Sequence, residues 1–167
     1  LDTICDPSFK EKSKSALQTG QEVPNEDAHT TFLQMDFGIC KNDKGELFPQ
    51  LIEIQGFPSL YFYQHMMGYL YKKYFNLPDN LTHLFNGLTD SDYVNLMRKI
   101  IVGDSDPDKV VLLEVEPHNQ ATQIDFWVTV AELGIAVKCV SDIFRKGNKI
   151  YYKNNLGKEI LIERIYN

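Results

Sequence analysis

The sequence predicts an α/β fold with a mixed sheet, and three observations lead to that prediction. Residues 31–41 and 47–55 alternate apolar and polar side chains around a glycine-containing turn, which is typical of a β-hairpin. Further along, a β-branched run at 109–116 is followed by a helical pattern and by a second apolar run at 135–140. This order predicts a βαβ unit with two parallel strands. Residues 149–165 then predict a β-hairpin at the C-terminal end.

Three helices are expected in addition to the strands. The first covers 59–75, with Ser59 as its N-cap, and is apolar on almost all sides. We therefore expect it to be buried against the sheet; its methionines and aromatic residues are interpreted as core packing rather than as a cofactor-binding box. The second covers 89–101 and begins with acidic residues that suit a helix N-terminus. The third covers 122–133 and ends at Gly134.

The N-terminal residues 1–30 are polar and weakly periodic, so we expect loop there and a single α/β domain over 31–167. The chain begins with Leu1, and its last residues read as a strand that stops part-way. We expect the 167 residues to be a piece of a longer protein.

Composition excludes several classes of partner. The formal net charge of -6 and the absence of a basic run with interleaved aromatic residues argue against a nucleic-acid partner. No apolar run reaches the roughly 20 residues of a membrane span, so no membrane partner is expected. The three cysteines are an odd number without metal-type spacing, which favours a reduced, cytoplasmic protein. The oligomeric state is left open.

The first predicted hairpin carries the strongest candidate site. A turn centred on residues 44–45 places Asp36 opposite Glu53 and Gln34 opposite Gln55, all on one face. Two opposed carboxylates repel each other, which favours a bound cation or a shared proton between them. The alternative is an ordinary strand pair with solvated acids, because a register slip of one residue would place Asp36 opposite an isoleucine.

A second candidate site follows the strand at 109–116. Ligands bind at the carboxyl ends of the strands in open α/β sheets. Polar residues are concentrated there, namely Glu116, His118, Asn119, Gln120 and Thr122. We expect His118 and Asn119 to contribute to ligand binding. The alternative is that Asn119 and Thr122 only cap the next helix.

The hairpin resembles a known family. Its first strand reads Gln34-Met35-Asp36-Phe37, and its second reads Ile52-Glu53-Ile54-Gln55 followed by Gly56-Phe57-Pro58-Ser59-Leu60. This arrangement resembles glutathionylspermidine synthase and related ATP-grasp ligases. Strands of the form Arg-Phe-Asp-Phe and Leu-Glu-x-Asn precede a Thr-Pro-Ser turn and a helix in that family.

The resemblance implies that Asp36, Glu53 and Gln55 bind Mg²⁺ and that Gln34 and Gln55 lie at the phosphates of ATP. Two positions depart from the family pattern: Gln55 replaces an Asn, and Gln34 replaces an Arg that would contact phosphate. The resemblance also implies a Rossmann-like pre-ATP-grasp domain with the ATP-grasp lobes missing.

For the intact protein the resemblance implies an ATP- and Mg²⁺-dependent carboxylate–amine ligase whose substrates are a small-molecule acid and an amine. An acyl phosphate forms in such ligases and is attacked by the amine. We expect the 167-residue piece to be inactive alone. The alternative function is a non-catalytic α/β domain that binds a small ligand or another protein.

Overall fold

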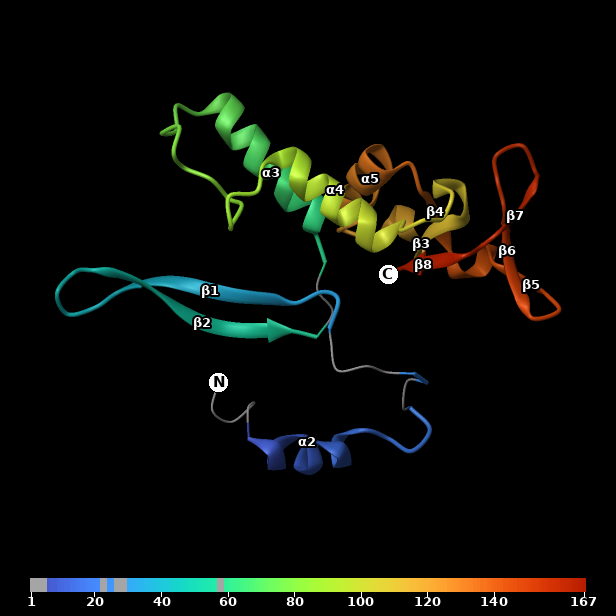
Figure 1. Cartoon of the computed structure of the whole chain (residues 1–167), viewed down its shortest axis with the longest axis horizontal. Helices are drawn as coiled ribbons and strands as arrows, with labels where there is room; N and C mark the ends of the chain where they lie inside the picture. The colour runs from blue at the N-terminus through green and yellow to red at the C-terminus, as the bar shows by residue number, and fades with distance from the viewer. Residues whose placement is uncertain (1–5, 22–23, 26–29, 57–58) are drawn as a thin grey trace. The chain divides into compact units, whose positions relative to one another are not determined.

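The computed structural model describes residues 6–21, 24–25, 30–56 and 59–167 (Figure 1). It divides into two compact units, Leu1–Leu33 and Gln34–Asn167. The predicted strand break at Phe57–Pro58 lies outside the described residues.

The first unit contains a helix where the sequence predicted only loop. Helix α2 covers Pro7–Ser13 and continues as the short 3-10 helix η1, Lys14–Ala16. The Asp6 side chain accepts a hydrogen bond from the Ser8 N–H at 2.8 Å, and Pro7 occupies the first helical turn. A side-chain cap and an N-terminal proline are both local signals for a helix start, and the loop prediction overlooked them.

The second unit is a mixture of helices and strands. Its described helices are α3 (Tyr61–Tyr74), α4 (Asp90–Ile101) and α5 (Gln123–Leu133). Its described strands are β1 (Gln34–Lys41), β2 (Leu47–Gln55), β3 (Val110–Glu114), β4 (Ala136–Cys139), β5 (Phe144–Lys146), β6 (Lys149–Lys153), β7 (Glu159–Leu161) and β8 (Arg164–Tyr166). Short 3-10 helices occur at η2 (Pro107–Lys109), η3 (Pro117–Asn119) and η4 (Val140–Asp142).

These strands form three small sheets within the described residues. Strands β1 and β2 form a hairpin, β4-β3-β8 form a parallel sheet, and β5-β6-β7 form an antiparallel sheet. The predicted βαβ unit is confirmed, because β3 and β4 are parallel and α5 connects them. The fold is therefore mixed α/β. The prediction of one mixed sheet is wrong, because each sheet of the described residues is either parallel or antiparallel and the hairpins do not join the parallel sheet.

The C-terminal segment was predicted to form one strand of a hairpin, but it forms two strands in different sheets. The predicted hairpin forms between β6 and β7, but the chain then leaves that sheet and β8 pairs with β3 in the parallel sheet. Two backbone hydrogen bonds mark the point where the chain passes from one sheet to the other. The Ile162 N–H donates to the Ile150 carbonyl at 3.0 Å, and the Glu163 N–H donates to the Lys109 carbonyl at 2.9 Å. Ile162 is buried with Val111 and Tyr152, so burial of one side chain between two sheets accompanies the switch.

Helix α3 is less buried than the sequence predicted. Phe62 at its start is fully buried, but the exposed fractions of Tyr69, Tyr71 and Tyr74 are 52%, 50% and 70%. The first part of α3 lies near α5, whereas its second part extends away toward a long loop (Figure 1). The prediction that this helix is buried against the sheet is therefore wrong for its C-terminal half, because too few neighbouring elements cover it.

The start of α3 also differs from prediction. Its N-cap position is Leu60, in the left-handed conformation with φ 66°, and no local side chain caps it. Instead the buried Asp125 of α5 accepts a hydrogen bond from the Tyr63 N–H at 2.8 Å. The prediction that Ser59 caps the helix is wrong, since a residue distant in sequence takes that place.

The limits of α4 and α5 follow the sequence closely. Thr89 and Asp92 form a capping box at the start of α4, in which each side chain bonds the other residue's backbone N–H. Helix α5 ends at Gly134, which adopts φ 74°. Both signals are local, so tertiary contacts are not needed to place these ends.

Candidate functional site

The β1–β2 hairpin is shaped by its turn and by one bulge. The Asn42 side chain accepts hydrogen bonds from the backbone N–H groups of Lys44 and Glu46, at 3.0 and 2.9 Å, and Gly45 adopts φ 80°. Between the turn and Phe37, each residue of β1 pairs with a residue one position away from its predicted partner. A β-bulge next to Asp36 then leaves Ile52 unpaired, and the predicted register holds from Asp36 onward.

The bulge decides which residues face each other at the open end of the hairpin. Gln34 pairs with Gln55, and Asp36 pairs with Glu53. Directly opposed residues of an antiparallel pair share a face, so the two carboxylates lie on the same side of the hairpin. The predicted pairing is thus confirmed, although no local pattern indicated the bulge that produces it.

We call this group of four, Gln34, Asp36, Glu53 and Gln55, the hairpin cluster. Asp36 is half-buried, and its two carboxylate oxygens accept hydrogen bonds from both glutamine amides. Gln34 Nε2 lies 3.4 Å from Asp36 Oδ1, and Gln55 Nε2 lies 3.0 Å from Asp36 Oδ2. Gln34 Oε1 is buried and meets no hydrogen-bond donor among the described residues. A buried acceptor without a donor is costly unless a ligand or ion satisfies it.

The loop after β3 is strained at its second residue. Glu116 is in the left-handed conformation with φ 50°, which is unusual for a residue with a side chain. Its backbone N–H donates to Cys139 Sγ at 3.4 Å, and its carboxylate accepts from Asn119 Nδ2 at the same distance. Asn119 is therefore used within the loop rather than as a helix cap.

The other polar residues of this loop also bond one another. Gln120 Nε2 donates to Glu114 Oε2 at 2.9 Å and to the Val115 carbonyl at 2.8 Å. Thr122 Oγ1 donates to Gln120 Oε1 at 3.3 Å and makes no capping bond to α5, although Thr122 occupies the N-cap position. The interpretation that Asn119 and Thr122 only cap α5 is therefore wrong.

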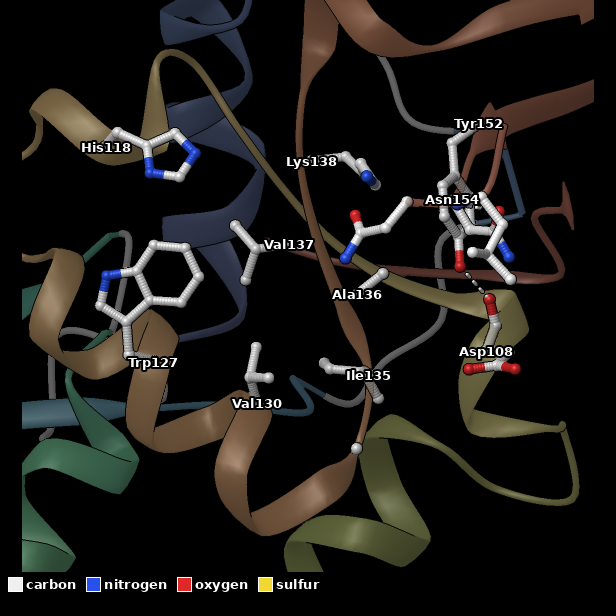
Figure 2. Close-up of a pocket in the computed structure, with 13 residues that line it drawn as sticks. Asp108, His118, Trp127, Val130, Ile135, Ala136, Val137, Lys138, Tyr152 and Asn154 are labelled. Carbon is white, nitrogen blue, oxygen red and sulfur yellow. Dashed lines mark hydrogen bonds between the residues drawn. The ribbon is translucent and has the colours of Figure 1, made fainter. Parts of the chain in front are cut away.

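His118 is exposed on this loop and lies beside an indole. Its ring centroid is 5.3 Å from that of Trp127, and both residues line a cavity of about 550 Å³. Figure 2 shows Lys138, Tyr152 and Asn154 across the cavity from them. Lys138 Nζ lies 5.0 Å from the centre of the Tyr152 ring. Tyr152 donates its hydroxyl proton to the Asp108 carbonyl at 2.6 Å, shown as a dashed line in Figure 2.

The structure brings together only part of the predicted site. The hairpin cluster is a contiguous group, whereas His118 lines the cavity without Asn119. In the part of the chain that the structure describes, no hydrogen bond or ion pair joins the hairpin cluster to His118 or Asn119. We therefore treat the hairpin cluster and the cavity at His118 as separate candidates.

Sequence reasoning missed one cluster of possible metal ligands. His65 of α3, His83 of the following loop and Asp90 of α4 bring one donor atom each to within 4.8 Å of the others. Burial lowers the pKa of His83, with Asp90 acting in the opposite direction. The spacing of these residues along the chain matches no common metal-binding motif, so only the fold brings them together.

Comparisons with known proteins found no match. No family model matches the chain, and neither a curated protein nor a solved structure does. Among the helices of the described residues, none combines the length and apolar character needed to cross a membrane.

Proposed function

We propose that this chain is part of an ATP- and Mg²⁺-dependent carboxylate–amine ligase resembling glutathionylspermidine synthase, built on a Rossmann-like pre-ATP-grasp domain. One observation carries the proposal: Asp36 and Glu53 are paired across the hairpin with Gln34 and Gln55 beside them. The acid and amide positions of the family resemblance therefore occur on one face, where a single ligand can contact all of them.

The hairpin cluster fits Mg²⁺ by its donor chemistry. Two carboxylates and two amide oxygens are hard oxygen ligands, which this ion prefers. Gln34 Oε1 is already buried without a donor among the described residues, so a donor group of a bound ligand would satisfy it. Asp36, Glu53 and Gln55 would hold the ion, and the amide groups would contact the nucleotide. When bound, Mg²⁺–ATP supplies the phosphoryl group that activates a carboxylate substrate.

A second candidate function is a non-catalytic α/β domain that binds a small ligand or another protein. The hydrogen bonds of Asp36 favour it, because both of its carboxylate oxygens already accept an amide N–H. Gln34 also stands where the resemblance would place an arginine, and a neutral amide cannot balance phosphate charge.

The deciding experiment measures Mg²⁺–ATP binding by isothermal titration calorimetry in the intact protein and its Asp36→Asn variant. The ligase proposal expects the variant to lose roughly tenfold or more in affinity, about 1.4 kcal/mol. The matched control is Asp43→Asn, which removes the same charge from the turn of the same hairpin. Equal affinity in all three proteins would contradict the nucleotide site and favour the non-catalytic function.

A second measurement tests the reaction itself. ADP release by the intact protein is followed with a panel of small acids and amines. The proposal expects release that requires both an acid and an amine and that Asp36→Asn reduces. Binding of Mg²⁺–ATP without such release would identify a nucleotide-binding domain without ligase activity.

A further inference from the structure

Three side chains from separate parts of the chain form a compact cluster, which we call the His65 cluster: His65, His83 and Asp90. His65 Nδ1 lies 3.4 Å from His83 Nε2 and 3.7 Å from Asp90 Oδ1, and His83 Nε2 lies 4.0 Å from Asp90 Oδ1. Ligand atoms bound at about 2.0–2.1 Å to a tetrahedral Zn²⁺ are themselves about 3.4 Å apart. The three atoms therefore form a triangle close to the size that a zinc ion requires.

The surroundings of His65 hold this donor in place. Its side chain is 11% exposed, and its ring stacks on Tyr93 of α4 with a centroid distance of 4.9 Å and an interplanar angle of 24°. Asp90 is the first residue of α4 and directly follows its N-cap, Thr89. The capping box at the start of α4 therefore fixes the backbone of Asp90. Two of the three ligands are thus positioned without any metal.

A glycine makes the position of His83 possible. A Cβ added to Gly68 would lie 2.5 Å from the Cε1 and Nδ1 atoms of the His83 ring, which is closer than any real contact. Gly68 lies three residues after His65 and therefore on the same face of α3. Glycine inside a helix costs about 1 kcal/mol relative to alanine. This glycine clears the space in which the His83 ring reaches His65.

The hydrogen bond between the two imidazoles is the simplest alternative explanation of the cluster. That bond is long, at 3.4 Å, and it places one ring nitrogen of each histidine next to a carboxylate oxygen. Two imidazole nitrogens and one carboxylate oxygen are the donor set typical of zinc sites with three protein ligands. Mg²⁺ prefers an all-oxygen shell, so this cluster differs in chemistry from the hairpin cluster.

We propose that the His65 cluster binds one Zn²⁺ ion and thereby joins α3, the loop that follows it and the start of α4. Neutral imidazoles and one carboxylate leave a net positive charge on the bound ion. The fourth coordination position is open to water or to an external ligand. His65 and Asp90 also line an apolar groove of about 540 Å³ with Met66, Tyr69 and Trp127, so an external ligand has room to approach.

The test is zinc binding by the purified, metal-free chain. The affinity and stoichiometry are measured by competition with a chromophoric chelator, and Co²⁺ substitution reports tetrahedral geometry through its visible absorption. We expect one ion per chain and a rise in the thermal unfolding midpoint when Zn²⁺ is added. His83→Ala should weaken binding by roughly tenfold or more and abolish the rise.

Two further variants separate metal binding from general damage. Gly68→Ala keeps all three ligands and should support the helix, yet it should weaken zinc binding because it displaces the His83 ring. Asp104→Asn removes a carboxylate at an exposed turn outside the cluster, as the matched control for Asp90→Asn, and should bind zinc as the wild type does.

Two results would overturn the proposal. The first is the absence of stoichiometric zinc binding by the folded wild-type chain. The second is wild-type zinc affinity in His83→Ala or Asp90→Asn, since the ion would then be bound elsewhere. Neither result bears on the Mg²⁺–ATP site, which depends on Asp36.

Discussion

Asp125 shows how a single buried residue organises two helices. It is 4% exposed, and its carboxylate accepts a hydrogen bond from the Tyr63 N–H of α3 at 2.8 Å and interacts with the backbone N–H groups of Phe62 and of the N-cap residue Leu60. The N–H groups at a helix start have no partners within the helix, so the side chain of α5 supplies what a local N-cap normally would. Burial raises the pKa of Asp125, and the backbone donors act against that rise.

Replacing Asp125 by alanine should destabilise the protein. The change leaves buried N–H groups without an acceptor, so we expect the free energy of unfolding to fall by about 2–3 kcal/mol. Asp125→Asn keeps one acceptor oxygen and should lose less of the unfolding free energy. Urea denaturation measures the unfolding free energy of both variants. Asp104→Ala, at an exposed turn, is the control and should stay within about 0.5 kcal/mol of the wild type.

Asp92 should make stability depend on acidic pH. Hydrogen bonds from the Thr89 side chain and backbone lower the pKa of Asp92 below 3.8 in the folded state. A lowered folded pKa stabilises the protein above the unfolded pKa, and that stability is lost as the pH falls through the folded pKa. The gap in unfolding free energy between wild type and Asp92→Asn should therefore be constant near neutral pH and narrow below pH 3.8. A gap independent of pH would contradict the capping role.

At the scale of elements, arginine side chains from neighbouring elements bind the carbonyl groups at the C-terminal ends of α4 and α5. Arg98 of α4 donates to the Leu133 carbonyl at 3.1 Å and to the Glu132 carbonyl, both at the end of α5. Arg164 of β8 donates to the Ile101 carbonyl at 2.9 Å and to the Ile100 carbonyl at 2.8 Å, both at the end of α4. A cation is favourable at a helix C-terminus, where carbonyl groups lack partners. These bonds connect β8 to α4 and α4 to α5.

The Arg164 contact can be tested by substitution. Arg164→Met keeps the aliphatic chain but removes two charged hydrogen bonds, so we expect a loss of about 1–2 kcal/mol in unfolding free energy. Arg164→Lys should recover only part of it, because an ammonium group cannot form the same planar fork. Chemical denaturation reports the values, with the exposed Lys158→Met as control. If the Arg164→Met variant were as stable as the wild type, β8 would be held by its sheet pairing alone.

The β1–β2 hairpin should be less stable than the parallel pair of β3 and β4. One of its faces carries exposed apolar side chains, with exposed fractions of 46% for Met35, 48% for Phe37 and 69% for Ile39. An isolated two-stranded hairpin is marginal in water, whereas Val110 and Val111 of β3 are fully buried. Hydrogen exchange followed by mass spectrometry should therefore find β1 and β2 exchanging faster than β3. Equal protection would mean that the apolar face is covered in solution.

At the scale of the whole molecule, we expect the 167-residue chain to have no ligase turnover by itself. The hairpin cluster consists of acids and amides, and the resemblance places the phosphate-binding arginine at Gln34. Phosphoryl transfer depends on positioning the phosphates and on neutralising their charge. Acid and amide side chains without an arginine can position a metal ion but cannot by themselves neutralise phosphate charge. ADP release by the chain is compared with that of the intact protein under the same acids and amines. Amine-dependent release by the chain alone would show that its own residues complete the site.

The sequence by itself determined the elements that carry local signals. These signals lie within or directly beside the element they define. They are the capping box of Thr89 and Asp92, the glycine at 134 and the apolar runs of β3 and β4. Alternation and a glycine turn also predicted the hairpin and the pairing of Asp36 with Glu53, but a bulge at Ile52 that no local signal indicated produces that pairing. These signals act over a few residues, and their physics is that of hydrogen bonding and side-chain periodicity within one segment.

Tertiary structure alone decided the features that depend on neighbours distant in sequence. The apolar pattern of α3 does not reveal that its second half lacks covering elements, and no local signal sends β8 to a different sheet from β7. Asp125 caps α3 from 62 residues away, and His65 meets His83 only because Gly68 leaves room. Such features follow from which surfaces pack together. Packing is settled by the whole chain, so a local pattern cannot determine it.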